Sequence, residues 1–189
     1  MASIRLDGPD WLDGVVRPRL GADATDAARM AWVAELVERQ VDARTGGPFA
    51  AAVFSGLSGD VLGVGVNRVE ATSTCVAHAE VLALAEAGQA LGRYTLEGHA
   101  AVLVTSTEPC AMCLGAVGWS GVERVVCGAT DGDARAIGFD EGDKPHDWEG
   151  ALRRRGVTVV TSVGAGRVQA AMQRYAAEGG TVYNAAPAD

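Results

Sequence analysis

The chain of 189 residues is long enough for one domain with a substantial hydrophobic core, and two independent domains would be cramped. Hydrophobic residues make up 48% of it and charged residues 21%, which is typical of a soluble globular protein and excludes a largely disordered one. The net charge of −8 argues against a polynucleotide partner, because binding to phosphates depends on basic side chains that displace counterions. We therefore expect a small-molecule ligand.

The four cysteines are too few and too dispersed for the disulfide framework of a small secreted domain, so we expect reduced thiols. The first twenty residues contain no apolar run of the signal-peptide type. No stretch approaches the roughly 18 consecutive apolar residues of a membrane-spanning helix. These features predict a cytoplasmic protein without a membrane partner.

The N-terminal residues 1–22 are rich in Asp, Gly and Pro and show no periodicity, which predicts an irregular extension ahead of a domain over 23–189. Met30 and three valines then recur at spacings of three or four residues. This pattern predicts an amphipathic helix from 23 to 43, which ends at the turn Gly46-Gly47-Pro48.

Two apolar stretches follow at 49–55 and 61–66, joined by a Gly/Ser-rich turn that favours a hairpin. A helix is predicted over 77–91. The run AAVLVT at 100–105 is typical of a buried strand, and Pro109 then marks the start of a helix that continues to Trp119.

Two more strands are predicted at 122–127 and 157–163, with a short helix over 148–155 between them and a last helix over 167–178. The arginines at 153–155 are interpreted as a solvated helix end rather than a phosphate site. Strands that alternate with helices indicate an α/β fold, a three-layer α/β/α sandwich. Its sheet is mixed because the first two strands form a hairpin.

Two short motifs place polar side chains at predicted helix starts. His78-Ala79-Glu80 opens one helix, and Pro109-Cys110-Ala111-Met112-Cys113 opens another. Two thiolates spaced C-x-x-C in a first helical turn can bind one metal, since the free N–H groups of that turn stabilise their negative charge. With His78 as the third ligand, the set of Cys110, Cys113 and an imidazole predicts a tetrahedral Zn²⁺ site with one open position.

Glu80 lies two residues after His78, where its carboxylate can sit beside a water molecule without binding the metal. Zinc lowers the pKa of a bound water from about 15.7 towards 7. A neighbouring carboxylate can take the proton of that water and return it to a substrate. The motifs therefore predict hydrolytic chemistry, with Glu80 as the catalytic proton carrier.

Other interpretations of these residues were weighed. A thioredoxin-like redox function of the C-x-x-C motif leaves His78 and Glu80 without a role. A structural zinc normally has four protein ligands, and Cys75, three residues before His78, is either the candidate fourth ligand or a small buried residue. Cys127 lies in an apolar strand and is interpreted as a core residue.

HAE followed by PCxxC is the signature of zinc deaminases, and the chain resembles the cytidine-deaminase-like superfamily, in its guanine deaminase and nucleoside deaminase branch. The resemblance runs from Thr45 to the C-terminus. It implies the cytidine-deaminase-like fold, with a five-stranded mixed sheet flanked by helices, and it implies a homodimer. The motifs that carry it are GGPF (46–49), HAEV (78–81), TSTEPCAMCLGAVGWSG (105–121), RVVCGATD (124–131) and IGFDEG (137–142).

The same resemblance implies substrate contacts at Phe49, Asn67, Ala79, Trp119, Glu141 and Tyr183. A carboxylate accepts from the adjacent N–H donors of guanine, and an amide both donates and accepts. The resemblance implies that Tyr183 closes the active site of its own chain or of a neighbouring subunit. Five of these positions also have a simpler explanation: Asn67 shapes a turn, Phe49 and Trp119 belong to the core, Glu141 is solvated, and Tyr183 lies in an ordinary surface tail.

The resemblance implies replacement of an exocyclic amine by a carbonyl, with release of ammonia. Guanine or a similar aminopurine is the first candidate substrate, guanosine or another nucleoside the second, and cytosine or an aminotriazine the third. Ala50 and the triplet Thr74-Cys75-Val76 depart from the family pattern near the pocket, which bears on the substrate and not on the metal ligands.

Two further alternatives were considered. The charge of −8 disfavours a tRNA adenosine deaminase. The presence of Glu80 disfavours a non-catalytic binding module.

Overall fold

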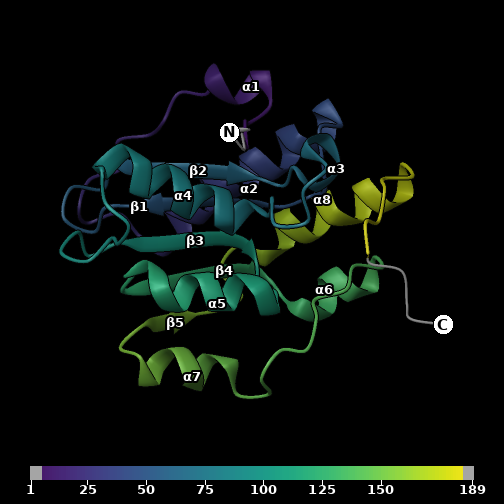
Figure 1. The fold of residues 1–189 in the computed structure, drawn as a ribbon. Helices are drawn as coiled ribbons and strands as arrows, with labels where there is room; N and C mark the ends of the chain where they lie inside the picture. Colours follow the sequence, from purple (N-terminus) through teal and green to yellow (C-terminus); the bar gives the residue numbers. More distant parts are fainter. Residues whose placement is uncertain (1–5, 185–189) are drawn as a thin grey trace, which may run out of the picture.

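One mixed sheet of five strands forms the centre of the computed structural model, which describes residues 6–184 (Figure 1). The strand order is β2-β1-β3-β4-β5, with β1 antiparallel to both β2 and β3, and with β3, β4 and β5 parallel. The strands are β1 (Ala50–Phe54), β2 (Val61–Val66), β3 (Val102–Thr107), β4 (Arg124–Ala129) and β5 (Thr158–Val160).

Helices cover both faces of this sheet, which confirms the predicted three-layer α/β/α fold. The helices α2 (Asp26–Ala43) and α8 (Ala165–Ala177) lie on one face. The opposite face carries α4 (Ala79–Leu91), α5 (Ala111–Ser120) and α7 (Trp148–Arg154) (Figure 1). Three shorter helices are α1 (Asp10–Asp13), α3 (Val69–Thr72) and α6 (Asp131–Ala136).

Strand β1 shows how the sequence builds two cores on one sheet. All five of its residues are buried, and successive side chains point to opposite faces. Ala50, Ala52 and Phe54 join the cluster beneath α2 and α8, whereas Ala51 and Val53 join the cluster beneath α4, α5 and α7. A central strand that is covered on both faces is therefore apolar throughout, as its sequence predicted.

The predicted long helices and strands are all present, with shifted ends. β3 ends at Thr107 rather than at 105, because Ser106 is buried and its hydroxyl accepts a hydrogen bond of 3.1 Å from the backbone N–H of Ala50. A polar side chain that is satisfied in this way can continue a buried strand. The helices α1, α3 and α6 were missed because four to six residues are too few to show a helical period.

The N-terminal segment contains α1 and otherwise no helix or strand between residues 6 and 22. It packs on the α2 side of the core, where the indole N–H of Trp11 donates to the Thr45 hydroxyl at 3.0 Å. A domain boundary at residue 22 stays a prediction. In the part of the chain that the structure describes, no helix is long and apolar enough to cross a membrane. The cytoplasmic location stays a prediction.

The close approach of α4 to β2 depends on two glycines. A Cβ atom at Gly65 would lie 2.0 Å from the carbonyl oxygen of Ala79, and one at Gly63 would lie 2.3 Å from that of Ala83. Both distances are far shorter than van der Waals contact. The missing side chains therefore let the first turn of α4, which carries Glu80, lie directly on the sheet.

We expect Gly65→Ala to lower the free energy of unfolding by about 1–3 kcal/mol, because the added methyl group must push α4 away from β2. Urea denaturation of the variant measures the effect. Gly166→Ala is the matched control, since Gly166 is an exposed residue of α8 where a Cβ meets no atom within 4 Å. It should leave stability unchanged or raise it by up to about 1 kcal/mol. Equal effects of the two substitutions would show that the close packing is unimportant.

Candidate metal centre and active site

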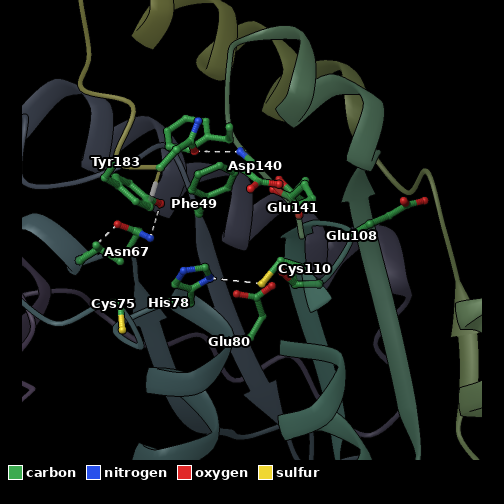
Figure 2. Close-up of a pocket in the computed structure, with 15 residues that line it drawn as sticks. Phe49, Asn67, Cys75, His78, Glu80, Glu108, Cys110, Asp140, Glu141 and Tyr183 are labelled. Carbon is green, nitrogen blue, oxygen red and sulfur yellow. Dashed lines mark hydrogen bonds between the residues drawn. The ribbon is translucent and has the colours of Figure 1, made fainter. Parts of the chain in front are cut away.

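His78 and Cys110 occupy equivalent positions at the starts of two helices. His78 is the N-cap of α4 and Cys110 the N-cap of α5, both in extended backbone conformation, and Cys113 lies in the first turn of α5. Because β3 leads directly into the loop before α5, and α4 packs on β1 and β2, the two helix starts meet above the sheet. Figure 2 shows the imidazole of His78 facing the sulfur of Cys110.

The three candidate ligands lie at the spacing that a tetrahedral zinc ion requires. The Nδ1 atom of His78 is 3.5 Å from the Cys110 sulfur and 3.6 Å from the Cys113 sulfur, and all three donor atoms lie within 4.8 Å of one another. Bonds of about 2.3 Å to sulfur and about 2.0 Å to nitrogen, at a tetrahedral angle, place such atoms about 3.5 Å apart. The residues therefore fit a zinc ion, and Nδ1 is the histidine nitrogen that faces it.

The two thiols are electrostatically coupled. A hydrogen bond from Cys113, helped by His78, lowers the pKa of Cys110 to about 4, and the same contact raises the pKa of Cys113. Burial by itself lowers the pKa of His78, but the contact with Cys110 and the charge of Glu80 outweigh it, so the net pKa is raised. The Cys110 thiolate and the His78 imidazole can bind a cation. The charge of that cation would then favour ionisation of the Cys113 thiol.

Glu80 lies in the same buried cluster. It belongs to the first turn of α4, and its carboxylate lies beside Cys110, below the ring of His78 (Figure 2). Burial raises its pKa, and the neighbouring Cys110 thiolate adds to the effect. Among the described residues, no lysine or arginine lines the pocket, so the negative charge there has no protein cation to offset it. A divalent cation at the three ligands would supply that charge.

A cavity of about 140 Å³ opens in front of this cluster. Five of the residues predicted for catalysis or substrate contact line it together with two predicted ligands, His78 and Cys110. The five are Phe49, Asn67, Glu80, Glu141 and Tyr183. Cys113 lies behind them, fully buried.

Asn67 and Tyr183 meet across the mouth of the cavity. Asn67 follows β2 and is 1% exposed, and its side-chain N–H donates to the Tyr183 hydroxyl at 2.5 Å (Figure 2). Its backbone carbonyl accepts from the buried Gln40 amide at 2.7 Å, which holds the residue in place. Asn67 also accepts from the Val69 N–H at 3.3 Å, so it shapes the local turn as well as facing the pocket. Tyr183 covers the cavity of its own chain.

Glu141 is buried, at 7% exposure, and is not solvated in the acidic loop around it. Burial and the negative charges of Cys110 and Glu80 raise the pKa of Glu141 to about 8. Its backbone carbonyl accepts from the N–H of Ala111 at 3.0 Å, which ties this loop to the first turn of α5. The sequence alternative of a solvated side chain is therefore wrong.

Aromatic side chains form one wall of the cavity, and Phe49 was predicted there whereas Phe139 was not. Phe139 packs edge-to-face on Phe49, with ring centroids 4.9 Å apart, and lies 5.0 Å from the ring of Tyr183. Phe139 lies in the motif IGFDEG, which was linked to Glu141 alone. Six further lining residues were not predicted, because the motifs that contain four of them were linked only to the metal ligands, Trp119 and Glu141: Val69, Thr105, Thr107, Glu108, Asp140 and Asn184.

Two residues expected at the substrate do not line the cavity. Trp119 is 81% exposed, because six helical residues after Cys113 bring a side chain around to the other side of α5. As a wall of the pocket within this chain, the prediction for Trp119 is wrong. Ala79 is buried in the core beneath α4, and its side chain packs away from the cavity.

The remaining cysteines are separate from the ligand group. Cys75 lines the cavity but is exposed, and it is not one of the three residues whose donor atoms cluster. Both interpretations of Cys75, as fourth ligand and as buried residue, are therefore wrong. Cys127 is fully buried in β4, as predicted, and burial raises its pKa, which keeps the thiol neutral.

Two solved structures are similar to this chain over nearly its whole length. A guanine deaminase from Nitrosomonas europaea superimposes with a TM-score of 0.86 at 42% identity, and the match covers 93% of this chain and 97% of that one. A structure solved in complex with 2,6-diaminopurine gives a TM-score of 0.88 at 42% identity, with 96% and 97% covered.

Sequence comparison identifies the family. Guanine deaminase of Bacillus subtilis is 41% identical over 101 residues, which are 53% of this chain and 62% of that enzyme, so the match spans less than two thirds of the relative. Residues 24–129, more than half of the chain, match the model of the cytidine and deoxycytidylate deaminase zinc-binding region. The zinc cofactor expected from the three ligands agrees with this match. The chain belongs to the cytidine and deoxycytidylate deaminase family, whose zinc-binding region it contains.

Proposed function

We propose that this protein is a zinc-dependent hydrolytic deaminase that acts on guanine or a similar aminopurine. The observation that carries the proposal is the convergence of His78, Cys110 and Cys113 at tetrahedral ligand spacing, with the buried carboxylate of Glu80 beside them. The likeness over nearly the whole chain to a guanine deaminase and to a structure that holds an aminopurine supports the choice of substrate.

Zinc held by His78, Cys110 and Cys113 would lower the pKa of a water molecule and so supply a nucleophile at neutral pH. Glu80 takes a proton from the attacking water and delivers it to the ring nitrogen beside the carbon that bears the amine. Glu80 then takes the remaining proton from the newly added hydroxyl group and delivers it to the amine. The C–N bond breaks, ammonia departs, and the carbon–oxygen bond becomes a carbonyl. The raised pKa of Glu80 suits this role, because a carboxyl group that both accepts and donates protons works best near the operating pH.

The remaining pocket residues would hold the base. The amide of Asn67 can donate to and accept from a purine edge, and Glu141 can accept from adjacent N–H donors of guanine. Phe49 and Phe139 provide an apolar wall against a flat ring. The cavity of about 140 Å³ corresponds to about five water molecules at the volume of about 30 Å³ that each occupies in the liquid, which suits a free base. Tyr183 lines this small cavity and so leaves little space for an attached ribose.

Ammonia release from a panel of guanine, 2,6-diaminopurine, guanosine, adenine and cytosine tests this function. We expect turnover of at least one free aminopurine, with guanosine clearly slower. Glu80→Gln should lower kcat by about 10²–10⁴-fold while the protein keeps one zinc per chain, because glutamine cannot transfer the proton.

One result would contradict the proposed activity, and another would contradict only the role of Glu80. Zinc-loaded protein that releases no ammonia from any candidate would favour a binding module. A fully active Glu80→Gln variant would remove Glu80 from the mechanism and leave the deaminase activity standing.

The ligand assignment predicts that replacing Cys113 weakens zinc binding strongly and that replacing Cys75 does not. Cys113→Ser should reduce zinc affinity by more than the roughly 10–100-fold that loss of an outer-shell partner costs, because a direct bond to the ion is lost. Cys75→Ser should leave one zinc per chain. Elemental analysis after dialysis against a chelator measures both, and zinc loss from Cys75→Ser would require a different ligand set.

We also propose that the protein forms a homodimer through the outer face of α5. Trp119 projects from this face, and it lines two hollows of about 410 and 260 Å³. The larger is mainly apolar, with Leu114, Pro145 and Trp148 in its wall, and the smaller includes the exposed Tyr94. The indole of one chain could fill a hollow of an identical chain, and the reverse contact would form at the same time. A two-fold interface between identical chains requires such a self-complementary surface.

If this face is the interface, Trp119→Glu should convert the dimer into a monomer, since two charges would be buried at the contact. Light scattering coupled to size-exclusion chromatography measures the mass of the particle. Leu57→Glu, which changes an exposed apolar residue at the β1–β2 turn, is the control and should stay dimeric. A wild-type monomer at micromolar concentration would refute the proposal.

A further inference from the structure

Lys144 is the single lysine of a chain that carries fifteen arginines, and its side chain is 9% exposed. Its ammonium nitrogen lies 3.2 Å from a carboxylate oxygen of Asp131 and 3.6 Å from one of Glu108. It also lies 5.0 Å from the centre of the Trp148 ring. Such a buried ammonium is compact enough to pair with two carboxylates and one aromatic face at once, which a planar guanidinium does less readily.

The two carboxylates belong to the framework of the active site. Glu108 follows β3 and lies two residues before Cys110, and Asp131 follows β4 as the first residue of α6. The backbone N–H of Asp131 donates to the Glu108 carboxylate at 3.1 Å. Lys144 therefore contacts the segments that follow the parallel strands β3 and β4, and the segment after β3 leads to the metal ligand Cys110.

Lys144 also belongs to the loop that presents Glu141, three residues earlier. Gly142, between them, has a positive φ of 70°, and its carbonyl accepts from the Lys144 N–H at 3.1 Å and from the Arg135 guanidinium at 3.1 Å. Hydrogen bonds to the Gly142 carbonyl therefore fix the middle of the loop, and the buried ammonium of Lys144 fixes its end.

This arrangement opposes a specific electrostatic force. Glu141 is buried beside Glu80 and Cys110, so both desolvation and repulsion favour a loop that turns its carboxylate out into water. Lys144, three residues after Glu141, carries a positive charge that opposes this effect, and its own pairing with Glu108 and Asp131 depends on the loop staying in place.

We propose that Lys144 is a positioning residue, which anchors the loop over 138–145 so that Glu141 stays in the pocket and recognises the base. The inference rests on the proposed deaminase function, in which Glu141 contacts the substrate. It assigns the positioning of Glu141 to a lysine that itself does not line the cavity.

A double-mutant cycle tests the proposal, with Lys144→Met and Glu141→Gln made singly and together. Initial rates of ammonia release from guanine give KM and kcat for each zinc-loaded protein. We expect Lys144→Met to raise KM about tenfold with kcat changed less than twofold. In the Glu141→Gln background the same substitution should change KM less than twofold, because the group that it positions is gone.

Arg154→Met is the matched control, since it removes an exposed cation paired with Asp147 on α7 and should leave KM unchanged. An unchanged KM in Lys144→Met, or the same rise in both backgrounds, would overturn the positioning role. If Lys144→Met does not fold, Lys144→Gln takes its place in the cycle under the same criteria. A wild-type protein that deaminates no aminopurine would instead refute the proposed function, so the two failures are distinguishable.

Discussion

The meeting of two helix starts above the sheet is the constraint on which the rest of this structure depends. A tetrahedral zinc ion requires its ligand atoms about 3.5 Å apart, and here His78 must meet two cysteines that lie more than thirty residues later in the sequence. The start of α5 is set by β3, which leads directly into Cys110. The start of α4 is set by its packing on β2, where Gly63 and Gly65 allow backbone contact.

Once the ligands meet, the pocket becomes a concentration of negative charge. The thiols, Glu80 and Glu141 are buried together, and no lysine or arginine of the described residues lines the cavity. Such a cluster is costly without a counter-charge, so the site is suited to a divalent cation at its base. The same shortage of counter-charge explains why a cation outside the cavity, Lys144, is placed to hold the loop of Glu141.

The substrate side of the pocket is built differently from the metal side. Its residues come from the end of β2, from the loop after α6 and from the segment after α8, and they meet through Asn67, Phe139 and Tyr183. Contacts between segments that are remote in sequence allow the base-recognition part to vary while the ligand geometry stays constant. Of the departures from the family pattern, Cys75 lines the cavity, whereas Ala50 is buried in the core cluster beneath α2 and α8.

The sequence by itself determined the three-layer fold and the zinc ligands, because both depend on short-range patterns. Apolar periodicity predicted every long helix and strand, and HAE with PCxxC identified the ligand group before any geometry was known. Only the tertiary structure decided which other residues share the pocket. It placed Phe139 in the wall and Trp119 outside it, and it buried Glu141 while exposing Cys75. The position of Trp119 follows from the helical spacing after Cys113, and the resemblance was followed instead of that spacing. The burial of Phe139 and Glu141 depends on packing between segments remote in sequence, which no local pattern records.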